Sequence, residues 1–145
     1  MRVVIAMDSF KGSLSSIEAG KAVAEGARRA DSTVECIVCP VADGGEGTSA
    51  ALTEGLHGET VRIPVTGPLG EKITAEYGVV GDLAILEMAQ AAGLPLVPKD
   101  KRNPMHTTTY GVGEMLRDAI NRGCKRFILG IGGSATNDGG IGMLQ

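Results

Sequence analysis

Short apolar runs that lead straight into polar, glycine-rich loops limit this 145-residue chain to few folds. The runs at residues 2–7, 34–41 and 127–131 are almost entirely apolar, as in parallel strands buried on both faces. A helix pattern follows each of the first two loops, and the third loop should open a helix near Ile141. Alternation of strand, loop and helix predicts an α/β fold. In open α/β sheets the ligand crevice lies at the carboxyl ends of the strands, where these loops begin.

Two helices carry strong local signals. Ser15 followed three residues later by Glu18 forms a capping box, which predicts a helix that continues to about Ala30. A second helix is predicted before Gly123, because apolar residues recur at helical spacing. The residues of this stripe are Val112, Met115, Leu116, Ala119 and Ile120.

The middle of the chain follows a different pattern. Apolar and polar residues alternate over residues 61–65 and 73–79 around a turn cluster, and residues 83–88 supply a further strand. This predicts an antiparallel meander. We place a domain boundary at the change of pattern, so that residues 1–65 begin a first α/β domain and residues 66–145 begin a second.

Composition argues against several classes of function. The net charge is −3, from 14 basic and 17 acidic residues spread along the chain, so no basic tract is present for nucleic acid. No apolar run approaches the roughly 20 residues that span a bilayer. The three cysteines are too few for a disulfide scaffold, and Cys36 and Cys39 lie three apart on a strand and so point to opposite faces. We expect a cytoplasmic protein without nucleic-acid or membrane partners and without a metal at these cysteines.

The first two loops contain candidate catalytic groups. Asp8, Ser9 and Lys11 place an acid, a hydroxyl and a phosphate-binding cation within four positions. In the second loop, Asp43 is suited to hold Mg²⁺ or to accept the proton of a substrate hydroxyl. The adjacent Gly44 and Gly45 leave the backbone exposed to a ligand. Glu46 is a weaker magnesium ligand, since stabilising the following helix N-terminus explains it equally well.

The third loop predicts an anion site. A glycine-rich turn between a buried strand and a helix presents free N–H groups and the positive end of the helix dipole. Asp138 adds a carboxylate. No Gly-Lys-Ser/Thr sequence follows, so this is not a P-loop. The candidate anion-binding residues are Gly132, Gly133, Ser134, Thr136 and Asn137.

These loops closely resemble those of the bacterial-type glycerate kinases. The matching stretches run in family order along the chain: DSFKGSLS (8–15), PVADGGEGT (40–48), PVTGPLG (64–70), EMAQAAGL (87–94), TTYGVGE (108–114) and IGGSATNDGG (131–140). The resemblance implies two α/β domains, the second inserted in the first, with ATP and D-glycerate meeting in the cleft between them. It also implies Mg²⁺ and a phosphoglycerate product, with 2-phosphoglycerate favoured.

Combining this resemblance with the loop chemistry gives each residue a role. Phosphoryl transfer needs positioning and charge neutralisation more than covalent chemistry. Lys11 would neutralise phosphate charge, Asp43 would orient or deprotonate the glycerate hydroxyl, and Asp138 is the alternative base or Mg²⁺ ligand. The sequence does not tell which loop binds ATP.

Two alternatives stay open at this point. The same loops would also suit a non-catalytic module that binds a phosphorylated metabolite, or an inert fragment. Family members continue past Gln145, so we expect this chain to hold the amino-terminal portion of such a kinase. We also expect strand 127–131 to be left partly uncovered, which would favour self-association.

Overall fold

The computed structural model describes residues 1–10 and 13–145, which form two compact units, residues 1–43 and 44–145. The mixed α/β class is confirmed. The predicted domains, 1–65 and 66–145, remain a prediction.

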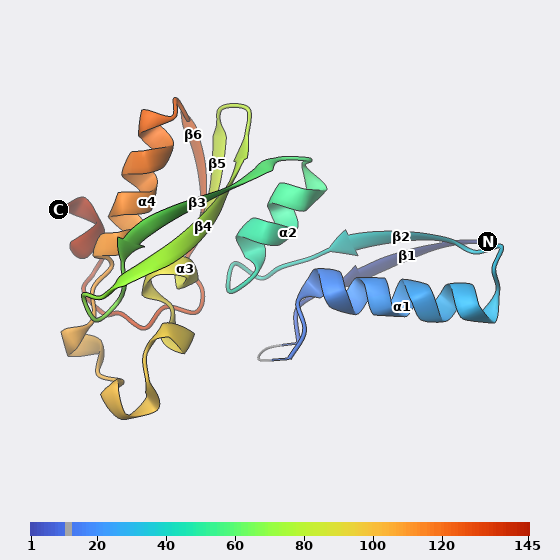
Figure 1. Cartoon of the computed structure of the whole chain (residues 1–145), viewed down its shortest axis with the longest axis horizontal. Coiled ribbons are helices and arrows are strands. Elements are labelled where there is room, and N and C mark those ends of the chain that lie inside the picture. The colour runs from blue at the N-terminus through green and yellow to red at the C-terminus, as the bar shows by residue number, and fades with distance from the viewer. Residues whose placement is uncertain (11–12) are drawn as a thin grey trace. The chain divides into compact units, whose positions relative to one another are not determined.

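The first unit contains β1 (Arg2–Met7), α1 (Ser16–Ala30) and β2 (Glu35–Pro40) (Figure 1). The second contains α2 (Thr48–Gly55), β3 (Glu59–Thr66), β4 (Lys72–Val80), β5 (Leu83–Glu87), α3 (Ala89–Ala92), α4 (Tyr110–Asn121) and β6 (Arg126–Gly130), with 3₁₀ turns η1 (Leu94–Leu96), η2 (Lys99–Lys101), η3 (Pro104–His106) and η4 (Gly142–Leu144).

The first unit is a parallel strand pair covered by one helix. β1 pairs with β2 in a register that aligns Met7 with Pro40, so both strands end at the same edge. The predicted capping box is present: the Ser15 hydroxyl accepts from the Glu18 N–H at 3.2 Å, and the Ser15 N–H donates to the Glu18 carboxylate at 2.9 Å. As expected, β2 leaves Cys39 exposed while Cys36 is half-buried.

The second unit is built on a four-stranded sheet of order β3-β4-β5-β6. β3, β4 and β5 pair antiparallel, which confirms the meander. β6 then pairs parallel with β5, and Glu87 at the end of β5 is aligned with Gly130 at the end of β6. The polar segments after these two strands therefore leave the sheet at one edge.

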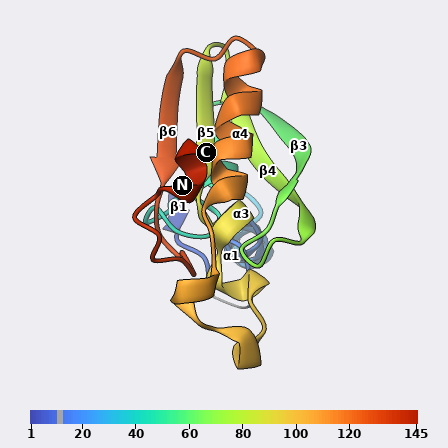
Figure 2. The ribbon, with the colours of Figure 1, turned by 90° about the vertical axis from the view of Figure 1, so that its left-hand side faces the viewer.

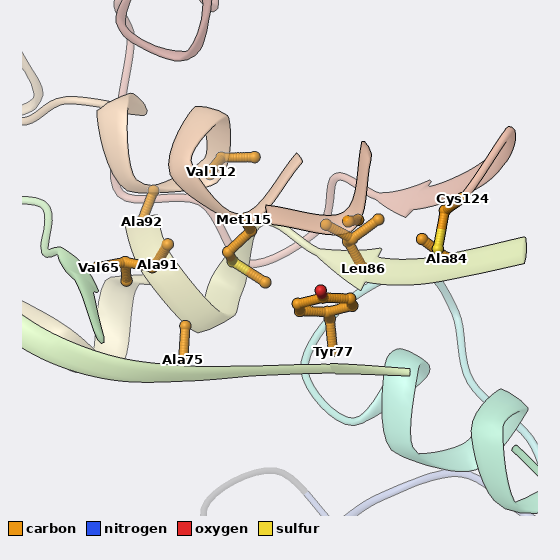
Figure 3. Packing of buried hydrophobic residues seen from close by; sticks show 11 residues of the cluster. Val65, Ala75, Tyr77, Ala84, Leu86, Ala91, Ala92, Val112, Met115 and Cys124 are labelled. Carbon is orange, nitrogen blue, oxygen red and sulfur yellow. The ribbon is translucent and has the colours of Figure 1, made fainter. Parts of the chain in front are cut away.

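Helices cover both faces of this sheet. Figure 2 looks onto the face that α4 crosses, and Figure 3 shows Met115 of α4 packed above Ala75 and Tyr77 of β4. α2 covers the opposite face, where a Cβ on Gly78 would lie 1.7 Å from the Thr53 hydroxyl. Glycine at this position lets α2 pack directly on β4. The core cluster comprises Val65, Ala75, Tyr77, Ala84, Leu86, Ala91, Ala92, Val112, Met115, Ala119 and Cys124.

Near Ile141, where the sequence predicts the start of a helix, the structure has one helical turn. The chain there forms only the 3₁₀ turn η4, and the Leu144 N–H donates to the Ile141 carbonyl at 3.1 Å. Gly139 and Gly140, which precede this turn, both have positive φ, 63° and 78°. In residues 1–10 and 13–145, no helix is long and apolar enough to cross a membrane.

Candidate functional site

Two glycine-rich loops of the second unit pack backbone against backbone. The N–H of Gly132, just after β6, donates to the carbonyl of Gly44 at 2.8 Å. A Cβ on Gly130 would lie 2.7 Å from the Gly44 oxygen, and one on Gly132 would lie 2.8 Å from the Cα of Gly45. Because no side chain fits between the two backbones, glycine is required on the β6 side. The structure thus brings together two segments that the sequence analysis selected independently.

This close approach predicts a specific sensitivity. Gly132→Ala should destabilise the protein by about 1–3 kcal/mol, because the added methyl group meets the backbone of Gly45, which can yield only by shifting the loop. Gly55→Ala is the matched control: a Cβ there meets nothing within 4 Å, so its effect should stay below about 0.5 kcal/mol. Urea unfolding followed by circular dichroism measures both changes. Equal stability of the two variants would contradict the packing described here.

Glu87 is a fully buried carboxylate that holds the loop of residues 44–47. Its Oε1 accepts from the Gly47 N–H at 3.1 Å and from the Gln90 side-chain amide at 3.3 Å, while its Oε2 accepts from the Ser49 N–H at 2.9 Å. Gly47, the N-cap of α2, has no side chain to satisfy these N–H groups. Glu87 supplies the missing acceptor from β5, and its negative charge suits the helix N-terminus.

The loop after β6 is held against α3 and η1. The Leu94 N–H donates to the Gly133 carbonyl at 2.9 Å, and the Ala135 N–H donates to the Ala92 carbonyl at 2.8 Å. Within the loop, the hydroxyls of Ser134 and Thr136 lie 2.8 Å apart. Both residues are half-buried, and the nearby Asn137 is exposed. The loop therefore presents hydroxyl groups from a fixed backbone.

Asp138 is tied into the same loop by four donors. Its Oδ2 accepts from the Thr109 N–H at 2.8 Å, the Thr109 hydroxyl at 2.7 Å and the Gly142 N–H at 3.3 Å, and its Oδ1 accepts from the Gly140 N–H at 3.0 Å. Asp138 thereby holds Thr109, the N-cap residue of α4, in place. The neighbouring Thr108 hydroxyl accepts from the N–H of Tyr110, the first residue of α4, at 3.1 Å. The carboxylate is thus a connector between the loop and α4, and its role as base or metal ligand stays a prediction.

The hydrogen bonds to Asp138 predict a pH dependence. Burial acts to raise its pKa, but the donors Thr109, Gly140 and Gly142 outweigh burial and hold the pKa below its usual value. A carboxyl whose pKa is lowered on folding contributes stability above its unfolded-state pKa of roughly 3.9 and loses it as pH falls through the lower folded-state value.

The Asp138→Asn variant should therefore unfold at lower urea concentration than wild type at pH 7. Below about pH 4 the difference in urea midpoint between the two proteins should become smaller, because the wild-type carboxyl is then protonated. Urea midpoints of both proteins between pH 2.5 and 7 measure the gap. A gap that stays constant over this range would show that the charge of Asp138 contributes nothing.

The first unit contains the remaining catalytic candidates. The Val41 N–H donates to the Met7 carbonyl at 3.1 Å, so the segments that carry Asp8 and Asp43 leave one edge of the β1-β2 pair. Both of these acids are exposed, and Asp8 accepts from the Ser9 N–H at 2.7 Å. Lys11 lies outside the described residues. The segments of the two acids therefore leave the same edge of the strand pair, and the roles of Asp8 and Asp43 stay predictions.

Glu46 is exposed and directly precedes the N-cap of α2. It lines a cavity of about 150 Å³ together with Glu87 and Gln90. In the part of the chain that the structure describes, no three His, Cys, Asp or Glu side chains are grouped so as to hold a metal ion. Glu46 as a magnesium ligand remains a prediction.

Comparison with known proteins identifies the family. The model of the Glycerate kinase family matches residues 3–145. The chain is 52% identical to the glycerate kinase of Halalkalibacterium halodurans over 99% of its own length and 38% of the relative's. It is 49% identical to the glycerate 2-kinase of Escherichia coli K12, and the match covers all of this chain and 39% of the length of that relative. A crystal structure from Salmonella typhimurium LT2, assigned as glycerate kinase 2, superposes with a TM-score of 0.83 at 48% identity, over the whole chain and 39% of that protein. The chain thus spans about two fifths of the length of these relatives and belongs to the glycerate kinase family.

Proposed function

We propose that this chain is part of an enzyme that transfers the γ-phosphoryl group of ATP to D-glycerate, with 2-phosphoglycerate as the product. Relatives named glycerate kinase and glycerate 2-kinase, at about half identity over the whole chain, support this activity. Since the chain spans less than two fifths of their length, the proposal concerns the full-length protein.

The packing of the two glycine loops is the observation that carries the proposal. Gly132 donates to Gly44, and the N–H groups of Gly133 and Ser134 engage no acceptor within the described part of the chain. Free amide groups in a fixed glycine turn at the carboxyl end of a strand are suited to phosphate or carboxylate oxygens. A kinase for a small acid has to bind both kinds of anion.

The acids and the lysine of the other loops complete the proposed chemistry. Asp43 orients or deprotonates the attacking hydroxyl, and Lys11 neutralises charge on the transferred phosphoryl group. Magnesium would arrive with ATP, and one or two carboxylates are enough to hold it beside the phosphates. Asp43 and Glu46 are the residues of this chain that fit that role, whereas Asp138 already accepts four hydrogen bonds.

Release of ADP tests the proposal. The full-length protein, given Mg·ATP, should release ADP when D-glycerate is added and should not respond to glycerol, which lacks the carboxylate. Saturable binding of D-glycerate without ADP release would favour a non-catalytic anion-binding protein. Absence of both binding and turnover would refute the proposal outright.

A further inference from the structure

A cavity beside the loop after β6 is lined by a cationic side chain, Arg102, that was not among the candidate residues predicted from the sequence. It has a volume of about 240 Å³ and lies between the loop after β6 and the segment of residues 94–107, which extends below α3 and α4 in Figure 1. Its lining residues are Leu94, Val97, Arg102, Asn103, Pro104, Thr107, Ser134, Ala135 and Thr136. Arg102 is the single charged side chain among these lining residues. The cavity therefore favours an anionic ligand.

Two hydrogen bonds orient the Arg102 side chain and leave some of its N–H donors available for a ligand. Its Nε donates to the Val97 carbonyl at 3.2 Å, and one terminal nitrogen lies 3.5 Å from the Leu94 carbonyl. A guanidinium carries five N–H donors in a planar fork, so at least three stay available. A fixed fork of this kind matches the two oxygens of a carboxylate.

The neighbouring polar groups are also donors. The Asn103 Oδ1 accepts from the Met105 N–H at 3.1 Å, which leaves the two N–H groups of the side-chain amide for a ligand. Ser134 and Thr136 use one hydroxyl proton between them at 2.8 Å, so the other hydroxyl is free to donate. The Thr107 hydroxyl is already engaged, since it donates to the Ala135 carbonyl at 2.9 Å. The described residues that line the cavity include no carboxylate, so no negative side chain among them repels a bound anion.

The volume of the cavity indicates which of the two substrates of a glycerate kinase, glycerate or ATP, it can enclose. Pockets that enclose drug-sized ligands measure about 300–1,000 Å³. A cavity of about 240 Å³ is below that range, which suits a three-carbon acid better than a whole nucleotide. We infer that Arg102, Asn103 and the Ser134–Thr136 hydroxyl pair bind the carboxylate of glycerate, so that this cavity selects a small hydroxycarboxylate. This inference rests on the proposed function, because it assigns the acid substrate to one side of the site.

Two variants of the full-length protein test this assignment of the cavity. KM for D-glycerate and KM for ATP are measured separately in each. Arg102→Gln removes the charge, and Asn103→Asp keeps the oxygen that accepts from Met105 while placing a negative charge in the cavity. Each should raise KM for D-glycerate by about 10-fold or more, because a hydrogen bond to a charged group is lost or reversed. KM for ATP should change less than 2-fold. Lys101→Met is the matched control, since it removes the neighbouring cation, which does not line the cavity, and should leave both constants unchanged.

Binding of the neutral analogue D-glyceramide provides a readout that a purely structural role would not move. Calorimetry should show that wild type prefers D-glycerate to D-glyceramide and that both variants lose most of this preference. A rise in KM for ATP alone would assign the cavity to nucleotide phosphate and overturn the inference, as would unchanged constants in both variants. If wild type binds D-glycerate but transfers no phosphoryl group, the proposed function fails, and the loss of binding in Asn103→Asp still decides the role of the cavity.

Discussion

Replacement of Asp43 by Asn in the full-length protein should lower kcat for glycerate phosphorylation by about 10²-fold or more. The amide has nearly the same shape as the carboxylate, so the fold should persist, but it can neither accept the hydroxyl proton nor hold a divalent cation. Asp43 is exposed and lies just after the β1-β2 edge, so no core packing is lost. Initial rates of ADP release at saturating ATP and D-glycerate measure the effect.

The control for this variant is a carboxylate of similar exposure away from the loops. Glu54→Gln, at the end of α2, should keep wild-type kcat. Circular dichroism and the urea midpoint of Asp43→Asn should match those of wild type. Turnover of Asp43→Asn within 3-fold of wild type would remove Asp43 from the chemistry and leave Asp138 as the base to be tested.

Replacement of Glu87 by Ala should destabilise the protein by about 3 kcal/mol or more. The variant leaves the N–H groups of Gly47 and Ser49 without their buried acceptor, and each hydrogen bond to a charged group is worth about 1.5–3 kcal/mol. It also opens a cavity at a side chain that is fully buried. Glu87→Gln keeps one acceptor oxygen and should cost less than Glu87→Ala. Urea unfolding followed by circular dichroism measures all of these variants.

An ion pair at the surface provides a control for the destabilisation expected of Glu87→Ala. Glu76 accepts from Arg62 at 2.7 Å between neighbouring strands, but both side chains are exposed to solvent, so Glu76→Gln should cost less than about 1 kcal/mol. If Glu87→Ala costs no more than Glu76→Gln, the buried carboxylate does not anchor the loop. Loss of kcat in Glu87→Gln, at retained stability, would show that the charge also positions residues 44–47 for catalysis.

Local signals in the sequence predicted the elements well. The Ser15 and Glu18 pair fixed the start of α1, and alternating side chains marked β3 and β4, because capping and strand periodicity depend on residues close together along the chain. The glycine loops were selected as candidate ligand-binding segments, and two of them pack on each other through Gly132 and Gly44. At Ile141, where a helix was expected, the structure has the 3₁₀ turn η4, and the sequence does not distinguish such a turn from the first turn of an α-helix.

The connectors within the site could not be predicted in the same way. Glu87 binds N–H groups 38 and 40 positions earlier in the chain, and Asp138 binds Thr109 29 positions earlier. Such pairs depend on how α2 packs beside the end of β5 and how the loop after β6 meets the start of α4, which no local pattern encodes. For Glu87 the available signal was an acid at the end of an apolar strand. Arg102 gave a weaker one, because it lies in a run of charged residues (99–102) that is equally typical of an exposed connection.

Identification of the product is the most direct test of the assignment as a glycerate kinase. The full-length protein is incubated with Mg·ATP and D-glycerate, and phosphorus NMR follows the reaction. We expect ATP to be converted to ADP together with an equal amount of a phosphomonoester whose proton coupling identifies phosphate on carbon 2 of glycerate. Omission of D-glycerate should abolish both signals. Consumption of ATP to inorganic phosphate, or no consumption while D-glycerate is bound, would contradict the assignment.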